Sequence, residues 1–210
     1  MQGISKLIIY DRISISMITE NSLRRLYIDE KLSMMEISAI LQCSHNQVVY
    51  WMHKYKIDRR SISDAIYQQH NPNGNPYSLQ PIDTIERAKL YGLGIGLYWG
   101  EGNKANRYAI RLGNTDAELI KLFMKFLIEI FCVKREDMRF QLQIFTDIDT
   151  ESALDYWTRV LSVNKSQFYK VHVTISSSIG TYKNKSKYGI ITVYYHNKHL
   201  RDILVELLPR

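Results

Sequence analysis

The amino-acid sequence predicts an α+β protein in two parts, a three-helix N-terminal module and a larger domain that combines helices with an antiparallel four-stranded sheet. Residues 21–65 carry apolar side chains at helical spacing. Residues 83–210 alternate between helical and period-two patterns. Between them, residues 70–81 contain three of the four prolines of the chain, which indicates a linker.

The chain is therefore expected to have four segments. Residues 1–20 form a tail or a short strand, and residues 21–69 form the N-terminal module. Residues 70–82 link this module to the main domain, which spans residues 83–210. The strands of the main domain are expected over residues 107–113, 139–146, 169–176 and 188–196.

Charge and cysteine usage restrict the class of function. The net charge of +7 favours a polyanionic partner, nucleic acid first and an acidic membrane surface second. Cys43 and Cys132 fit neither a zinc spacing nor a disulfide framework, which favours reduced thiols in a cytoplasmic protein. No apolar run approaches the roughly 20 residues that cross a membrane, so no membrane partner is expected.

The N-terminal module has the local signals of three successive helices. Leu23 and Leu26 share one face of the first. The second follows Ser33, with Glu36 at the spacing of a capping box, and after a short turn Ser44 is a natural N-cap for the third. The expected core positions are Ile37, Ile40, Leu41, Val48, Val49 and Met52.

Two capped helices joined by a short turn resemble the helix-turn-helix of resolvase-type and homeodomain-like DNA-binding domains. The start of the last helix would then meet base edges in the major groove, where Asn and Gln suit adenine. The alternative is a three-helix packing module with a solvated polar face. The residues expected to contact bases are Ser44, His45, Asn46, Gln47 and Tyr50, and those expected to bind phosphates are Lys54, Lys56, Arg59 and Arg60.

The stretch "YGLGIGLYWGEGNK" puts five glycines at the end of a helical pattern that starts near Asp83. Gly92, Gly96 and Gly100 recur every four residues and form one stripe, although each glycine costs about 1 kcal/mol of helix propensity. Such a stripe predicts a close, buried helix–helix contact that offsets this cost. A dinucleotide fingerprint would follow a strand and open a helix, and a P-loop would end in GK[ST], so both nucleotide-binding motifs are disfavoured.

Glu101 stands in the last turn of this helix, with Gly102 as the expected C-cap. The negative C-terminal end of the helix dipole destabilises the Glu101 carboxylate, and a divalent cation bound there would offset this repulsion. The alternative is a solvated acid at a helix end.

The segment "GIGLYWGEG" resembles the LAGLIDADG motif of homing endonucleases, with matches at Gly96, Leu97, Gly100, Glu101 and Gly102. In that family two such helices pack face to face through small residues, and the acid binds magnesium beside the scissile phosphate. The resemblance covers residues 83–208. It implies a dimer interface at Gly92, Gly96, Leu97 and Gly100, and a site for Mg²⁺ or Mn²⁺ at Glu101 and Gly100.

A single motif implies a homodimer that cuts double-stranded DNA at a near-palindromic target, with a saddle-shaped sheet on the DNA and no small-molecule substrate. The alternative is a non-catalytic transcription regulator with the same fold. Two features depart from the family pattern, because residues 103–114 leave room for one strand only and a helix over residues 150–161 is inserted between strands.

Basic residues of the main domain complete the expected site. No position matches the family's basic catalytic residue by motif, so Lys104 and Lys187 are candidates, with Arg111 considered beside them. Residues 164–201 contain no acid, and the loop "GTYKNKSKYG" predicts a phosphate-tracking arm, with a solvated lysine loop as the alternative. The DNA-binding residues expected in this domain are Arg111, Lys183, Lys185 and Lys187.

Overall fold

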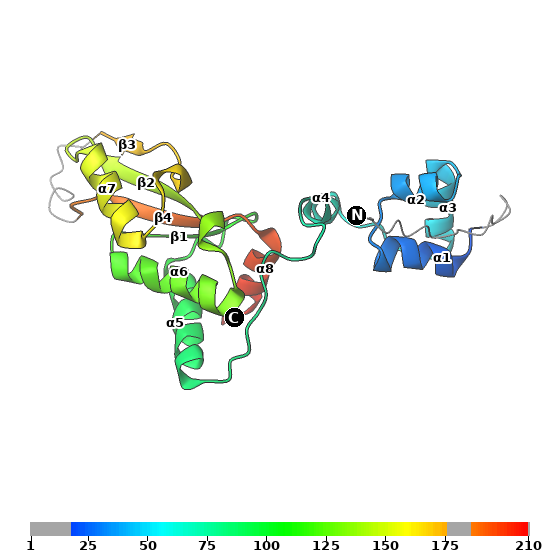
Figure 1. The fold of residues 1–210 in the computed structure, drawn as a ribbon, viewed down its shortest axis with the longest axis horizontal. Helices are drawn as coiled ribbons and strands as arrows, with labels where there is room; N and C mark the ends of the chain where they lie inside the picture. The colour runs from blue at the N-terminus through cyan, green and yellow to red at the C-terminus, as the bar shows by residue number, and fades with distance from the viewer. Residues whose placement is uncertain (1–17, 176–185, 210) are drawn as a thin grey trace, which may run out of the picture. The chain divides into compact units, whose positions relative to one another are not determined.

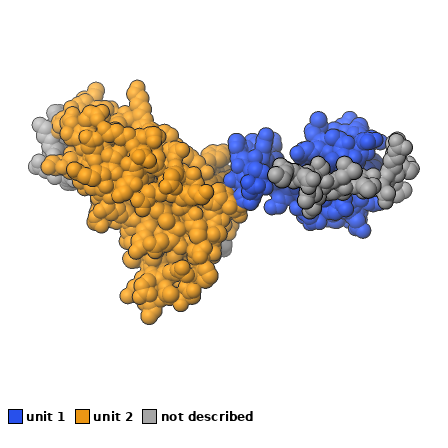
Figure 2. Space-filling view, in the orientation of Figure 1, with its two compact units in different colours: residues 1–74 blue, residues 75–210 orange. Residues whose placement is uncertain are grey.

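The computed structural model describes residues 18–175 and 186–209, which form two compact units, residues 1–74 and 75–210 (Figure 2). The division between the units falls inside the expected linker. Most of the expected tail, as well as Lys183 and Lys185, lies outside the described residues.

The first unit is helical. Helix α1 (Glu20–Arg24) continues into a π-helical turn (Arg25–Asp29), and α2 (Met34–Ile40) and α3 (His45–Lys54) follow. A further helix, α4 (Ile62–His70), forms where the sequence predicted only the end of a three-helix module. None of its residues is buried.

Capping boxes fix the starts of α2 and α3, as the sequence predicted for α2. The Glu36 carboxylate accepts a hydrogen bond from the Ser33 backbone N–H at 2.7 Å, and the Ser33 hydroxyl accepts one from the Glu36 N–H. The backbone bond from Ser33 is the main cause that lowers the pKa of Glu36. Ser44 and Gln47 form the equivalent pair at α3. Both helices therefore begin at positions set by local side-chain chemistry.

The core of the first unit matches the prediction in part. Ile37, Val48 and Met52 are buried as expected, and Leu41 packs against them. Ile40 and Val49 are only half-buried and do not belong to the core cluster. The remaining buried positions are Leu23, Leu26, Tyr27 and Ile57.

The second unit joins helices to a four-stranded sheet (Figure 1). Its elements in chain order are α5 (Ile85–Glu101), β1 (Ile110–Asn114), α6 (Ala117–Phe131), β2 (Arg139–Phe145), α7 (Thr150–Leu161), β3 (His172–Thr174), β4 (Ile190–Tyr195) and α8 (Lys198–Glu206). Short 3₁₀ turns precede β2 and β3. A single strand, β1, separates α5 from α6, and α7 lies between β2 and β3, as the sequence predicted.

The sheet is mixed, so the expected all-antiparallel sheet is wrong. The strand order is β1-β4-β2-β3; β4 runs antiparallel to β1 and β2, whereas β3 runs parallel to β2. The reason is the inserted helix α7, which carries the chain back along the sheet so that β3 starts at the same end as β2.

One face of the sheet is apolar and packs on α6 and α7 (Figure 1), while the other is polar. Side chains alternate between the two faces along each strand, so Phe140, Leu142 and Ile144 of β2 point into the core. Trp157 of α7 is buried there and donates its indole N–H to the Tyr188 carbonyl at 2.8 Å. The polar face is therefore the one that remains for a ligand.

Helix α5 packs against α6 through Gly94, which is buried. A Cβ at this position would stand 2.1 Å from the Phe126 ring, so the contact requires glycine. A Cβ at Gly92, Gly96 or Gly100, by contrast, would have no neighbouring atom within 4 Å. The buried helix–helix contact expected of this stripe is therefore absent from the described part of a single chain, and the intrachain contact uses the one helix glycine outside the stripe.

Candidate nucleic-acid interface

The open face of α5 combines glycines with exposed apolar side chains. Gly92, Gly96 and Gly100 lie on it, and Leu93 and Trp99 beside them are 53% and 55% exposed. Leu97, expected in the same interface, is half-buried and packs against the core of its own chain. This face can accept the backbone of another helix, because no side chain stands in the way at the glycines.

Glu101 ends α5 and is exposed. Within the described residues its carboxylate has no hydrogen bond and no ion pair. Gly102 is the C-cap, as expected, in an extended conformation with φ −70° and ψ 144°. A Cβ on Gly102 would stand 2.3 Å from the Tyr98 ring, so glycine lets the chain leave the helix closely past Tyr98 and bridge to Leu112 of β1.

Lys104 acts on the end of the same helix. Its ammonium donates to the Trp99 carbonyl at 2.7 Å, one of the carbonyls that a helix leaves unpaired in its last turn. A cation interacts favourably with the negative end of the helix dipole. Lys104 therefore already supplies part of the positive charge that would otherwise have to come from a metal bound at Glu101.

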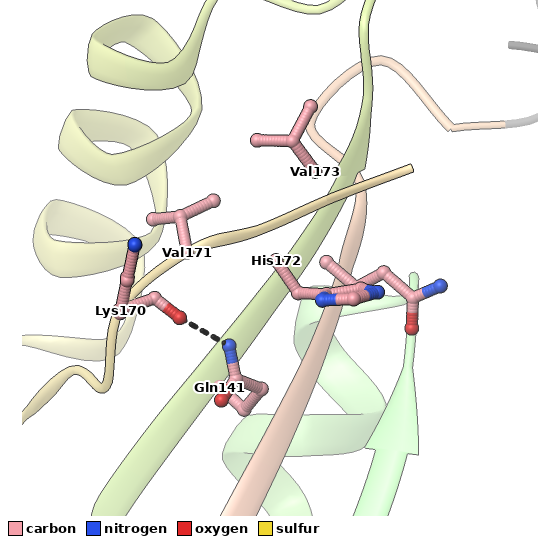
Figure 3. A pocket seen from close by; sticks show the side chains of 6 residues that line it. Gln141, Lys170, Val171, His172 and Val173 are labelled. Carbon is pink, nitrogen blue, oxygen red and sulfur yellow. Dashed lines mark hydrogen bonds between the residues drawn. The ribbon is translucent and has the colours of Figure 1, made fainter. Parts of the chain in front are cut away.

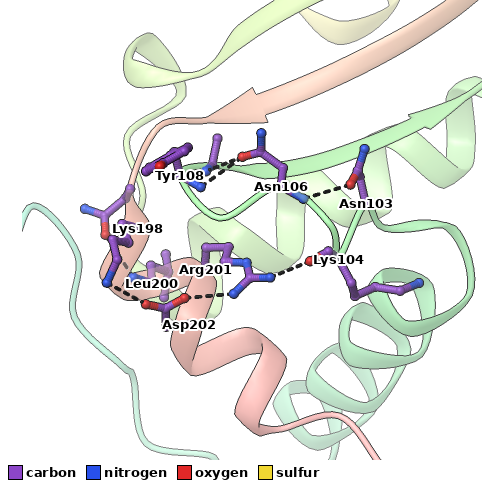
Figure 4. A network of polar contacts seen from close by, with 10 residues as sticks. Asn103, Lys104, Asn106, Tyr108, Lys198, Leu200, Arg201 and Asp202 are labelled. Atoms are coloured by element: carbon purple, nitrogen blue, oxygen red, sulfur yellow. Dashed lines mark hydrogen bonds and ion pairs between the residues drawn. The ribbon is translucent and has the colours of Figure 1, made fainter. Parts of the chain in front are cut away.

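The loop after Glu101 is held by β1 and α8 (Figure 4). The Asn103 N–H donates to the Arg111 carbonyl at 2.9 Å, and the Arg201 guanidinium donates to the Lys104 carbonyl at 2.5 Å. Asp202 in turn accepts from Arg201 and from Lys198. Partial burial acts to raise the pKa of Asp202, but these two cations hold it below the ordinary value. The position of the chain beside Glu101 is thus set by residues about a hundred positions away.

The described residues of one chain contain no complete metal site. Among the residues that the structure describes, no group of three or more His, Cys, Asp or Glu side chains is placed to hold a metal ion. Glu101 offers one carboxylate, a ligand that suits Mg²⁺ or Mn²⁺.

Lys187 is not brought to Glu101. Its ammonium lies over the Tyr188 ring, 5.2 Å from the centroid, and Tyr188 stacks on Tyr156 of α7. No contact between Lys187 and either Glu101 or Lys104 is present among the described residues. Of the three residues expected to act in catalysis, Glu101 and Lys104 lie at the end of α5, and Lys187 lies over the Tyr188 ring.

The polar face of the sheet presents cross-strand rows of side chains. The register sets Arg111 of β1 and Arg139 of β2 on either side of Tyr194 of β4. Directly paired residues point to the same face, so the two arginines and the tyrosine share it. The next row pairs Thr192 with Gln141.

A shallow hollow lies at the β2–β3 end of this face, lined by Gln141, Gln143 and residues 170–173 (Figure 3). Gln141 donates from its side chain to the Lys170 carbonyl at 2.7 Å, and Gln143 pairs with His172 across the strands. Gln, His and Lys side chains suit contacts with base edges and phosphates.

Sequence reasoning found Arg111 on this face but missed Arg139, Tyr194 and His196. The signal for Arg139 was present, because residues 139–145 alternate polar and apolar side chains with period two. What the pattern alone could not supply was the pairing that brings β2 and β4 together.

The start of α3 is only partly free for base contacts. Ser44 and Gln47 are joined in the capping box, with the Gln47 side-chain oxygen accepting from the Ser44 N–H at 2.9 Å. Asn46 and Tyr50 are exposed, and His45 is half-exposed. Asn46 and Tyr50 are thus the residues of this set most open to a ligand.

The basic residues after α3 differ in what they contact. Lys54 lies over the Trp51 ring, 4.5 Å from its centroid, and Lys56 and Arg59 are exposed. Arg60 instead turns inward. Its guanidinium donates to the carbonyls of Tyr27, Lys31 and Leu32 and to the Gln68 side chain, and it stacks on the Tyr27 ring. Arg60 therefore joins α4 to the rest of the first unit and is committed to structure.

Arg59 and Arg60 offer a matched pair of substitutions. Arg60→Ala is expected to lower the free energy of unfolding of the first unit by about 1.5–3 kcal/mol, because it removes charged hydrogen bonds to backbone carbonyls, two of them partly buried. Arg59→Ala is expected to change that free energy by less than about 0.5 kcal/mol. If Arg59 contacts a phosphate, its loss lowers the salt slope of DNA binding by about 1. Urea denaturation and binding titrations at several salt concentrations measure both effects, and equal stability of the two variants would contradict the assignment.

Within the described residues, no helix has the length and apolar character required to cross a membrane. Compared with known proteins, the chain matches no protein-family model, no curated protein and no solved structure.

Proposed function

We propose that this chain is a sequence-recognising DNA-binding protein that acts as a homodimeric, divalent-metal-dependent endonuclease of the LAGLIDADG type. The observation that carries the proposal is the open glycine face of α5, which ends at an exposed, unpaired carboxylate, Glu101. A second copy packed on this face would bring two such carboxylates together. One acid per chain would then provide a pair at a shared centre.

Charge and exposed side chains support DNA as the partner. The net charge is +7, and Arg111 and Arg139 lie on the polar face of the sheet without an ion pair among the described residues. In the first unit, Asn46, Tyr50 and Arg59 are exposed at and after the start of α3. The sheet would bind one stretch of the duplex, and the helix-turn-helix would enter a major groove.

A bound divalent cation would polarise the phosphate and supply a hydroxide nucleophile near neutral pH. Glu101 would hold the cation. Lys104 would keep the end of α5 in place and add positive charge beside the cleaved bond. The Arg201 contact with the Lys104 carbonyl would fix the loop that carries both.

A second candidate, a non-catalytic regulator with the same DNA-binding surfaces, is favoured by the contact of Lys104 with the Trp99 carbonyl. Because a cation already compensates the negative end of α5, Glu101 is tolerated there without a metal. The regulator needs dimerisation and DNA binding but not cleavage.

A randomised plasmid library separates the two candidates. The full chain is incubated with the library in Mg²⁺, in Mn²⁺ or in EDTA, and any new DNA ends are sequenced. Metal-dependent ends at one near-palindromic site are the expected result. Enrichment of a sequence by pull-down without any ends would favour the regulator, and neither ends nor enrichment would contradict both.

A further inference from the structure

The polar face of the sheet holds a cluster of cationic and aromatic side chains, Arg111, Arg139, Tyr169, Tyr194 and His196. Arg111 and Arg139 pair with Tyr194 from opposite sides. The Arg111 guanidinium lies over the Tyr194 ring at 4.9 Å, and the His196 ring stacks on the same tyrosine with centroids 5.9 Å apart. Strands β1, β2 and β4 therefore bring three nitrogen-rich side chains around one aromatic ring.

No carboxylate balances this cluster. Among the described residues, neither Arg111 nor Arg139 forms an ion pair, and the Arg111 Nε is buried without a hydrogen-bond partner. Arg139 donates to two backbone carbonyls, those of Glu136 and Met138. Two guanidinium charges without a carboxylate partner attract an anion, and a phosphate beside them would supply the missing negative charge.

His196 is linked to Tyr169, whose hydroxyl lies 2.6 Å from the His196 Nε2. When the imidazole carries a second proton, Nε2–H must donate to the Tyr169 oxygen, because both ring nitrogens are then donors. The Tyr169 hydroxyl hydrogen is thereby free to donate elsewhere. Protonation of His196 thus adds a positive charge and a hydroxyl donor to the same face.

The charged groups around His196 come from several elements. Partial desolvation lowers the pKa of His196 first, and the positive charges of Arg111 on β1 and Arg139 on β2 lower it further. Tyr169 precedes β3 and Tyr194 lies on β4, both uncharged. On α8, Lys198 and Asp202 pair with each other at 3.0 Å. The free protein therefore holds His196 neutral to a lower pH than an ordinary histidine.

We infer that Arg111, Arg139, Tyr169 and His196 form a proton-linked binding site for a backbone phosphate of DNA. The phosphate lies between the two arginines, accepts hydrogen bonds from their guanidinium groups and favours the protonated form of His196. Binding neutralises the arginine charges that oppose protonation, so one proton is taken up with the ligand. This inference rests on the proposed DNA binding, but it concerns neither Glu101 nor cleavage.

The affinity for DNA is expected to depend on pH through the protonation of His196. At fixed ionic strength the affinity of the full chain for a duplex rises as the pH falls from 8 to 5.5, by about tenfold for each unit by which binding raises the pKa of His196. His196→Gln removes this rise in affinity at low pH. His70→Gln is the matched control, because His70 is exposed at the end of α4 in the other unit, and this variant keeps the wild-type response. Arg111→Gln lowers affinity at every pH and lowers the salt slope by about 1.

A second measurement needs neither a variant nor DNA. Histidine resonances of the full chain are followed by NMR over the same pH range with and without sulfate, whose charge is constant there. Sulfate is expected to raise the pKa of His196. An unchanged pKa of His196, together with identical pH dependence of DNA binding in wild type and His196→Gln, would overturn the inference and leave the proposed function intact. A sulfate-induced rise without any DNA binding would keep the anion site and overturn the proposed function.

Discussion

Replacing Glu101 with glutamine is expected to abolish DNA cleavage while the affinity for DNA stays within about threefold of wild type. The substitution keeps the shape of the side chain but removes the charge that would hold a divalent cation. A metal acting as Lewis acid contributes several kcal/mol to the transition state, so cleavage should fall on the order of 10³-fold. Glu101 is exposed and without a partner in the described chain, so folding should be unaffected.

Glu86→Gln is the control for this substitution. Glu86 stands in the first turn of the same helix and is exposed, so its replacement makes the same chemical change far from the proposed site. Its loss costs only the few tenths of a kcal/mol of its interaction with the helix dipole. Cleavage at the selected site and binding to it are measured with Mg²⁺ for all three proteins. Cleavage by Glu101→Gln at the wild-type rate would contradict the role of Glu101 as the metal ligand, whereas binding without cleavage by all three proteins would leave the regulator as the better proposal.

Substitutions at Gly94 and Gly96 should have opposite effects on the stability of the chain. Gly94→Ala is expected to lower the free energy of unfolding by about 1–3 kcal/mol, because the added methyl group overlaps the Phe126 ring in a fully packed core. Gly96→Ala adds a methyl group to open space and is expected to raise that free energy by up to about 1 kcal/mol through helix propensity. Urea denaturation at low protein concentration, where the chain is monomeric, measures both.

The same pair tests the proposed dimer. If two α5 helices pack through the glycine stripe, Gly96→Ala places a methyl group between the backbones and weakens dimerisation by about 10- to 100-fold, equivalent to about 1–3 kcal/mol of overpacking. Sedimentation equilibrium of both variants and wild type gives the dissociation constants. A Gly96→Ala protein that is more stable yet dimerises as wild type would show that the stripe is not the interface.

Local chemistry explains what could be predicted of the fold. The capped starts of α2 and α3 depend on side chains within three residues of each cap, so Ser33 and Ser44 could be recognised directly. Helix α6 and strand β2 follow from the period of their apolar residues. The parallel pairing of β3 did not follow, because strand direction depends on the path that α7 imposes between two distant segments.

The candidate site likewise contains residues that the sequence identified and residues whose contacts only the tertiary structure shows. Glu101 and the glycine stripe were identified because they belong to one helix with a regular repeat. Arg60 was expected to bind phosphate, and only the tertiary structure shows that carbonyls of a distant turn surround its guanidinium. A basic side chain in a sequence carries no information on which acceptors the fold will place around it.

The sequence by itself determined the two-part organisation, the helical ends and the position of Glu101, since each depends on residues close together in the chain. Only the tertiary structure decided that Gly94 faces α6 while Gly96 stays open, because the face a helix buries depends on what packs against it. It also decided that Arg111 and Arg139 flank Tyr194. Those three residues are far apart in sequence, and the register of β4 between β1 and β2 brings them into one row.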